Sequence, residues 1–396
     1  MCMTILPVRE RIRGIDTVRG LIMVIMTLDH SRDFFHFQAP EYAPTNMATT
    51  TVILFFTRWV THYCAPTFVL LSGVSARLAG LKRTRTELTE FLFKRGLWLV
   101  ATDMLVITFL FTFDPRYHLF VLEVLWAIGC GMILLGLLIR LKAPLALIGG
   151  IGCILVFGHN LLDYIPVSDK GVTGNLLTLL LTGRGAVVPL GGDRIIVLLY
   201  SALPWSAVLL IGYMLGSLYE TGYDASRRRR VLLTAGAGLI TVFVLLRSVN
   251  AYGDPSPWSP QRNAVHTLLS FLNATKQPPS LVFLSMTLGP VLILLALIEK
   301  AANRLTAFCA VYGNVPYFYF LAHLSLLRVA NIVLILGSGL QMKSDGSPLV
   351  WQAQGFGYPL GIVYLNWAFI VVALYLPCKW YGNYKKTHRY WWLSYL

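Results

Sequence analysis

The sequence predicts an all-α, polytopic membrane helix bundle of about ten transmembrane helices, with both termini in the cytoplasm. Its composition is one reason, because 56% of the 396 residues are hydrophobic and only 13% are charged. The second is the presence of apolar runs long enough to cross ~30 Å of hydrocarbon. The third is that Lys and Arg gather in alternate loops, as expected of cytoplasmic segments.

The first half of the chain contains five of these runs. Basic residues precede the first run, but it exceeds signal-peptide length and has no small-residue cleavage site, so we interpret it as an uncleaved anchor. The second run contains Pro66, which loosens the helix backbone. The five predicted helices cover residues 15–37, 51–80, 89–112, 118–140 and 144–163.

The second half contains five further runs, separated by turn-rich or basic segments. Pro316 either kinks the ninth helix or divides it into two pieces. No soluble domain interrupts the chain, so residues 1–396 are predicted to form a single integral-membrane domain. The five predicted helices cover residues 195–219, 231–249, 280–299, 305–336 and 357–378.

The loop charges orient these helices. The rule places residues 81–95 and 219–230 in the cytoplasm and residues 250–279 outside. The longest outer loops, 164–194, 250–279 and 337–356, could form a lid or an acceptor groove, or serve as mobile connectors.

The net charge of +15 is mainly a signal of orientation and gives no reason to expect nucleic acid as a partner. Basic loops can also bind anionic lipid headgroups or a phosphorylated cofactor. The six cysteines lie in or beside helices without metal-ligand spacing, so we expect reduced packing residues and no metal.

Ionisable residues concentrate at the end of the first predicted helix. Asp29, Arg32, Asp33 and His36 have i, i+3, i+4, i+7 spacing and share one helical face, and His30 lies beside them. Charges at membrane depth are costly, so they indicate a functional site by default. The alternative is a structural ion pair between the aspartates and Arg32.

Other predicted helices also contain polar residues. At ~1.5 Å rise per residue, His30 and His323 lie about 22 and 27 Å from the cytoplasmic starts of their helices, so helices one, two and nine can converge on one site. Alternatively, the acidic residues pair with helix-embedded arginines and the histidines only pack. The further candidates are Arg58, His62, Asp103, Glu123, His323 and Arg328.

Five sequence segments carry a resemblance to a known family. DTVRG, LDHSRDFF, HYCAPTFVLLSG, VYGNVPYFYFLAHL and WWLSYL occur in this order from the first helix to the C-terminus. Together they resemble a bacterial member of the heparan-alpha-glucosaminide N-acetyltransferase family, within the wider transmembrane acyltransferase group. The resemblance implies an enzyme that moves acetyl from cytosolic acetyl-CoA to an amine or hydroxyl of a glycan-like acceptor on the periplasmic side of a bacterial inner membrane.

The family's functional residues carry over only in part. By distance from DTVRG, the family's Asn corresponds to Asp29 or His30. The segment that follows is longer here, so the family's His corresponds to His36 in sequence or to His62 in space.

Acyl transfer needs a base, and histidine suits that role near neutral pH. We expect His30 to be the base, Asp33 to orient it, and Arg32 or Arg58 to offset charge on the carbonyl oxygen. Direct transfer and an acetyl-histidine intermediate both remain open.

The remaining assignments concern binding. Arg58, His323, Arg328, Asp103 and Glu123 are assigned to the acceptor. Acetyl-CoA is expected to enter from the cytoplasm, where Arg77, Lys82 and Arg83 face its phosphates together with Arg227–Arg230.

The alternative function is a proton-coupled transporter of a solute or a lipid-linked glycan, which would use the same buried ions. Membrane lipids, acetyl-CoA and an amino-sugar or glycan acceptor are the expected partners. A homodimer is left open.

Overall fold

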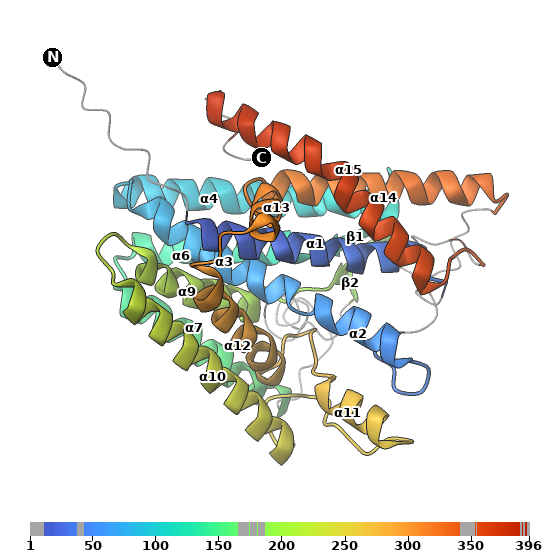
Figure 1. Cartoon of the computed structure of the whole chain (residues 1–396), viewed down its shortest axis with the longest axis horizontal. Coiled ribbons are helices and arrows are strands. Elements are labelled where there is room, and N and C mark those ends of the chain that lie inside the picture. Colours follow the sequence, from blue (N-terminus) through green and yellow to red (C-terminus); the bar gives the residue numbers. More distant parts are fainter. Residues whose placement is uncertain are drawn as a thin grey trace.

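Helices form nearly all the regular structure of the chain (Figure 1). The computed structural model describes residues 12–37, 43–164, 174, 180, 187–340, 353, 355–388, 390 and 393. The helices of the first half are α1 (Arg13–Phe35), α2 (Val52–Thr61), α3 (Cys64–Gly80), α4 (Arg85–Thr102), a π-helical turn (Asp103–Ile107), α5 (Thr108–Thr112), α6 (Val124–Arg140) and α7 (Leu145–Gly158). Those of the second half are α9 (Ala202–Leu215), α10 (Ala225–Val249), α11 (Ala264–Leu272), α12 (Leu281–Ile298), α13 (Arg304–Gly313), α14 (Pro316–Gly337) and α15 (Leu360–Thr387).

Two of the predicted helices are divided at a proline. The range 51–80 forms α2 and α3, and the chain turns at His62 and Tyr63. Pro66 cannot donate a hydrogen bond to the carbonyl of His62, and its ring would clash with that carbonyl in a continuous helix. Pro316 likewise begins α14 after a break that follows α13, so the ninth predicted helix consists of two pieces.

A small sheet interrupts the otherwise helical structure. Strands β1 (Leu119–Leu122), β2 (Val187–Gly191) and β3 (Arg194–Leu198) pair in the order β1-β3-β2. β1 is parallel to β3, and β2 is antiparallel to it. The predicted helices 118–140 and 195–219 were therefore wrong in their first residues, because a short apolar run has no periodicity that separates a strand from a helix.

The hydropathy of the helices agrees with a membrane bundle. Among the described residues, seven helices are long and apolar enough to cross a membrane, and α6 is a shorter apolar helix. The predicted helix bundle is confirmed, whereas the count of ten spans and the cytoplasmic termini stay predictions. Residues 341–352 and most of 165–186, in the predicted outer loops, lie outside the described part of the chain.

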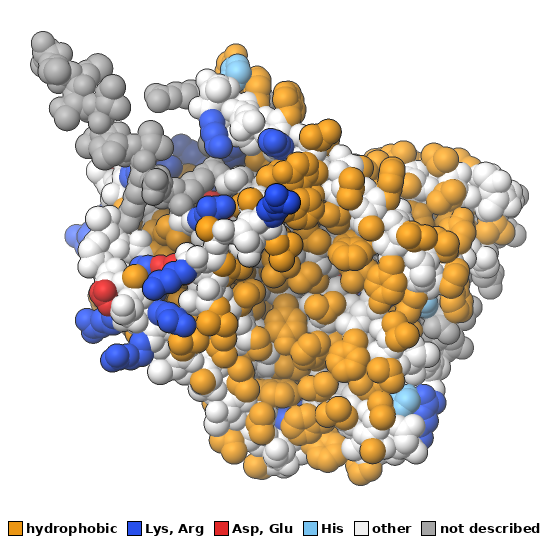
Figure 2. Space-filling model, viewed as in Figure 1, with side chains coloured by type: hydrophobic (Ala, Val, Ile, Leu, Met, Phe, Trp, Pro, Cys, Tyr) orange, Lys and Arg blue, Asp and Glu red, His pale blue; other side chains and the backbone are white. Residues whose placement is uncertain are grey.

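One end of the bundle is strongly basic. It contains the turn between α3 and α4, the start of α10 and the start of α1, which meets α12 near Glu299. We call it the basic end. In Figure 2 Lys and Arg side chains gather at the left edge, while hydrophobic side chains cover the middle of the molecule.

Glycines allow neighbouring helices to approach closely. A methyl group added at Gly20 of α1 would lie 1.7 Å from the carbonyl oxygen of Cys309 in α13, and one added at Gly313 would lie 1.8 Å from that of Asp16. Gly73 of α3 and Gly212 of α9 form a second reciprocal contact of this kind. Such contacts between small residues are typical of helix packing in membranes, where close approach favours association. The first contact holds α1 against α13, and the second holds α3 against α9.

The loop between α10 and α12 is held by a buried arginine. Arg247 donates hydrogen bonds to the carbonyl oxygens of Ser256, Phe271, Ser270 and Asn273. Asp254 accepts bonds from Thr275 and Ser280 and lies 3.5 Å from Arg247. This loop, predicted to be either a lid or a mobile connector, is therefore an ordered part of the structure.

Candidate active site

Two histidines from distant parts of the sequence meet about 25 Å along α1 from the basic end. His30 of α1 and His323 of α14 approach within 2.8 Å between Nδ1 and Nε2, and their rings are nearly parallel. His323 is fully buried, whereas His30 is half-buried. The structure thus brings together the histidines predicted from helices one and nine, whereas their depth in a membrane stays a prediction.

Hydrogen bonding fixes the tautomers of the pair. Nδ1 of His323 lies 2.9 Å from the carbonyl oxygen of Tyr319, which can only accept, so this nitrogen carries a hydrogen. In neutral His323, Nε2 then accepts a hydrogen bond from Nδ1 of His30. The Nε2 atom of His30 is left with a free lone pair. The arrangement therefore presents His30 as a proton acceptor.

Aromatic side chains surround the pair. Phe111 and Phe320 contact His30 edge-on, with ring centroids 6.1 and 6.3 Å away. The ring of Tyr319 stacks on His323, and its hydroxyl is 2.6 Å from the hydroxyl of Thr27. These contacts exclude water from one side of His30 and fix both rings.

A cluster of charges lies on the neighbouring face of α1. Asp29 pairs with Arg32 at 2.9 Å and also with Arg58 of α2. Arg32 pairs in addition with Asp33. Asp33 therefore binds Arg32, and His30 has His323 as a hydrogen-bond partner. The orientation of His30 by Asp33 stays a prediction. Nε and Nη1 of Arg32 are buried and have no hydrogen-bond partner among the described residues.

Lys276 approaches this cluster from the ordered loop before α12. Its ammonium lies 5.4 Å from the centre of the Tyr200 ring, and its charge acts on Asp29 and Glu123. Burial and the positive charge of Arg58 lower the pKa of Lys276. The loop thus adds a third cation beside Arg32 and Arg58.

His62 lies at the turn between α2 and α3. Its side chain is buried and meets the ring of Phe283 edge-on at 5.4 Å. Its Nδ1 has no hydrogen-bond partner among the described residues. His62 is thus placed close to the charges of Arg58 and Lys276, which act on it, and it does not contact the histidine pair through any described hydrogen bond.

The other predicted acceptor residues have no described hydrogen bond to the histidine pair, although the charges of Lys276, Asp33 and Asp29 act on Glu123. Asp103 is fully buried and accepts a hydrogen bond of 2.6 Å from the backbone nitrogen of Glu123, which precedes α6. Arg328 lies over the rings of Phe34 and Phe113 and donates to Asn331.

His36 follows the last residue of α1. It is buried, and it pairs through its backbone with Tyr358. The backbone of His36 therefore supports the pairing with Tyr358. In the same way, Arg328 packs on two rings and Asp103 supports the backbone of Glu123.

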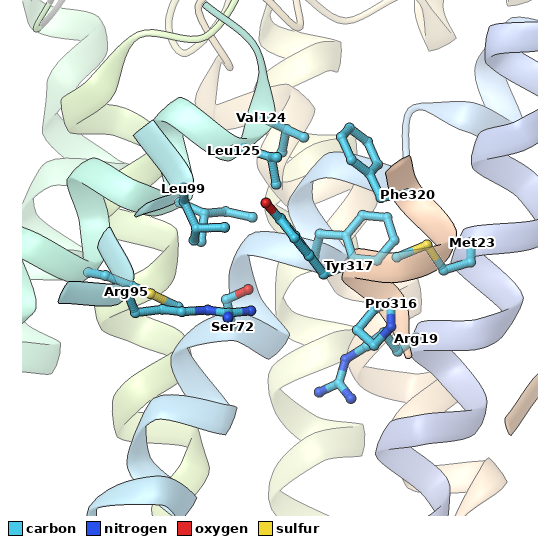
Figure 3. A pocket seen from close by; sticks show the side chains of 13 residues that line it. Arg19, Met23, Ser72, Arg95, Leu99, Val124, Leu125, Pro316, Tyr317 and Phe320 are labelled. Atoms are coloured by element: carbon cyan, nitrogen blue, oxygen red, sulfur yellow. The ribbon is translucent and has the colours of Figure 1, made fainter. Parts of the chain in front are cut away.

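A cavity lined by two arginines extends to Phe320 of α14 (Figure 3). It has a volume of about 110 Å³ and lies between α1, α3, α4, α6 and α14. In Figure 3 the guanidinium groups of Arg19 and Arg95 lie on one side, and Val124 and Phe320 lie on the other. Phe320 also contacts the ring of His30. We call this space the central cavity.

The predicted cofactor-binding residues lie at the basic end, away from the central cavity. Arg77 pairs with Glu220 at 2.6 Å and lies over the ring of Tyr213. Arg83 donates to the carbonyl of Ala79, and Lys82 is exposed.

Arg19, Arg95 and Lys276 were missed as site residues. The signal for Arg19 was its position inside the first predicted helix, where an arginine needs a partner or a ligand, and it pairs with Asp16 at 2.9 Å. Arg95 belongs to residues 81–95, which the loop charges placed in the cytoplasm. Lys276 gave no signal, because loop residues show no periodicity that predicts their neighbours.

No group of three His, Cys, Asp or Glu side chains suited to a metal ion occurs in the described part of the chain. The residues that are brought together are instead suited to proton transfer and to the stabilisation of negative charge.

The sequence also matches a known protein family. A model described as heparan-alpha-glucosaminide N-acetyltransferase, catalytic, matches residues 11–247, which is more than half of the chain. No curated protein matches it. The matched segment contains His30, Asp29 and Arg58, and it ends before Lys276 and His323.

Proposed function

The chain belongs to the heparan-alpha-glucosaminide N-acetyltransferase catalytic family, and from this premise we propose that it transfers acetyl from acetyl-CoA across a membrane to an amine or hydroxyl acceptor. The observation that supports this most is the tautomer of His30, which leaves Nε2 with a free lone pair, while the His30 ring contacts Phe320 at the edge of the central cavity. The alternative function, a transporter, would need proton-relay groups but no base for acyl transfer. The family match does not favour it.

His30 is the general base in this proposal. Its Nε2 takes a proton from the acceptor as the nitrogen or oxygen attacks the thioester carbonyl. A carbon–nitrogen or carbon–oxygen bond forms, the carbon–sulfur bond breaks, and the proton passes from His30 to the leaving thiolate. His323 keeps Nδ1 of His30 protonated throughout and is a positioning residue.

The arginines offset the negative charge that develops on the carbonyl oxygen. Arg32 has two N–H groups without described partners, and Arg58 is held in place by Asp29. Both arginines pair with Asp29, the residue directly before His30. Asp29 contributes by neutralising these cations in the resting protein, so the cluster can remain buried.

The central cavity is the proposed path of the donor. Arg19 and Arg95 would meet the phosphates of CoA, and the thioester arm would extend past Tyr317 toward Phe320 and His30. Arg77, Lys82 and Arg83 lie further out at the basic end, where they could attract the donor before it binds. In this proposal the basic end faces the cytoplasm of a bacterium, and a glycan-like acceptor approaches His30 from the periplasm.

The test is acetyl transfer in proteoliposomes with radiolabelled acetyl-CoA on one side and glucosamine on the other. The expected result is acetylated glucosamine with equal release of CoA, and its loss in His30→Ala while acetyl-CoA still binds. Solute flux without consumption of acetyl-CoA would contradict the proposal.

A further inference from the structure

A second cavity lies at the basic end, and it shares no lining residue with the central cavity. Its volume is about 260 Å³, and it is formed by the ends of α3 and α6, the starts of α4 and α7, and Tyr213 of α9. Three of its lining residues are cationic, namely Arg77, Arg85 and Lys142, and none is acidic. We call it the cationic cavity.

The cations of this cavity are not fully compensated. Glu220 pairs with Arg77. Arg85 and Lys142 have no acidic partner within ion-pair distance in the described part of the chain. The start of α7 adds to the positive potential, because Pro144 provides no capping side chain for its first backbone N–H groups. The cavity therefore favours an anion.

The remaining walls are apolar. Leu81, Leu88, Leu145 and Ile148 line the cavity beside the cations. Leu81 is 41% exposed, so the apolar wall continues onto the outer surface of the bundle. Cations at the helix ends with apolar side chains next to them match a phospholipid, whose charged headgroup lies above its acyl chains. A soluble nucleotide phosphate would not use the apolar walls.

We propose that the cationic cavity binds the phosphate headgroup of an anionic phospholipid, through Arg77, Arg85 and Lys142. The phosphate would lie between Arg85 and Lys142, which come from two different helix junctions. An acyl chain would pack along Leu88 and Ile148. Bound lipid would thus link the α3–α4 turn to the α6–α7 turn. This site shares no residue with the central cavity, and its binding can be measured without a donor or an acceptor.

The test measures lipid binding to delipidated protein by native mass spectrometry. Phosphatidylglycerol is the anionic probe, phosphatidylcholine the zwitterionic probe, and CoA the soluble phosphate probe. The Arg85→Ala/Lys142→Ala variant should bind phosphatidylglycerol about tenfold more weakly, because each basic residue contributes to attraction of an anionic lipid. Arg229→Ala/Arg230→Ala removes the same charge from exposed positions on α10 and should bind normally.

Three results would overturn the proposal. One is unchanged phosphatidylglycerol binding in Arg85→Ala/Lys142→Ala. Another is an equal loss in Arg229→Ala/Arg230→Ala, which would indicate general attraction to a basic surface. The third is a loss of CoA binding with normal lipid binding, which would make the cavity a nucleotide site. Thermal unfolding of each variant without lipid checks that the fold is intact.

Discussion

His323 determines the protonation pattern of His30, because it is the acceptor for Nδ1 of that residue. His323→Leu should therefore lower kcat by about one to two orders of magnitude with little change in the KM for acetyl-CoA. The loss should be smaller than the ~10² to 10⁴ expected on removal of a base in His30→Ala. Acetyl-transfer kinetics of the purified variants measure both effects.

His323→Gln tests the same assignment by rescue, since a glutamine oxygen can also accept from Nδ1 of His30. It should recover part of the activity that the leucine variant loses. His118→Ala is the control, because that histidine pairs with Asp114 and Asp193, has no described contact with His30 or His323, and should keep normal kcat. Equal activity of His323→Leu and the wild type would refute the assignment.

Asp29 neutralises two arginines, so its loss should affect folding before chemistry. Asp29→Asn leaves Arg58 without its carboxylate and Arg32 with Asp33 alone, and breaking a buried ion pair of this kind is expected to cost ~3–5 kcal/mol. The thermal unfolding midpoint in detergent should fall sharply. Adding Arg58→Met should restore much of the lost stability, because the cation that Asp29 neutralised is then also removed. If the double variant is less stable than Asp29→Asn, the ion pair is not what holds the cluster.

Lys276 should make stability depend on pH. Its pKa is lowered in the folded protein, so the unfolded chain binds more protons between the folded pKa and the usual value of 10.5. Folding stability contributed by neutral Lys276 is present above the unfolded pKa and is lost as pH falls through the folded pKa. The difference in unfolding midpoint between Lys276→Met and the wild type should therefore grow in favour of the variant as pH falls from 10 to 7. A difference that does not change with pH would contradict this.

At the level of elements, the contact between α1 and α13 depends on having no side chain at its centre. Gly313→Ala would place a methyl group 1.8 Å from a backbone oxygen of α1, and backbone cannot move aside cheaply. We expect a strong loss of folded protein, measured as the monodisperse fraction in size-exclusion chromatography. Gly238→Ala is the matched control, since that helical glycine has open space around it. Normal yield of Gly313→Ala would show that the helices can separate.

Hydropathy predicted where most helices lie, but not where they break or change type. The turn at His62 follows from Pro66, so the sequence contains the signal for this break. The strand Leu119–Leu122 could not be predicted, since its partner Arg194–Leu198 is far away in the chain. Strand pairing of this kind depends on tertiary contacts that a local pattern does not contain.

The site was predictable to the extent that it lies on helices. The rise per residue along each predicted helix places His30 and His323 at similar heights, which predicts that they can meet. The ion pairs could not be chosen from the sequence, because several acids and arginines lie within one turn of each other. Lys276 depends on the packing of an entire loop around Arg247, which no spacing rule describes.

For the whole molecule, the orientation in the membrane is the main prediction. If the basic end is cytoplasmic, a cysteine at Arg230 should react with an impermeant maleimide only after cells are permeabilised. A cysteine at Ala264 in α11 should react in intact cells. Cys64, Cys309 and Cys378 are buried, whereas Cys130 and Cys153 are partly exposed, so the unsubstituted protein is the labelling control. Labelling of Arg230→Cys from outside intact cells would reverse the topology.

The distance in sequence between His30 and His323 also has a consequence for biosynthesis. α1 enters the membrane first, with Asp29, Arg32 and Asp33 near its trailing end, and α2 soon supplies Arg58 as a counter-charge. The histidine partner arrives only with α14, after most of the other helices have been inserted. A nascent chain released before α14 would therefore contain the whole matched family segment and an exposed His30, but no group to fix its tautomer. Catalytic competence is acquired late in translation, when the bundle closes around α1.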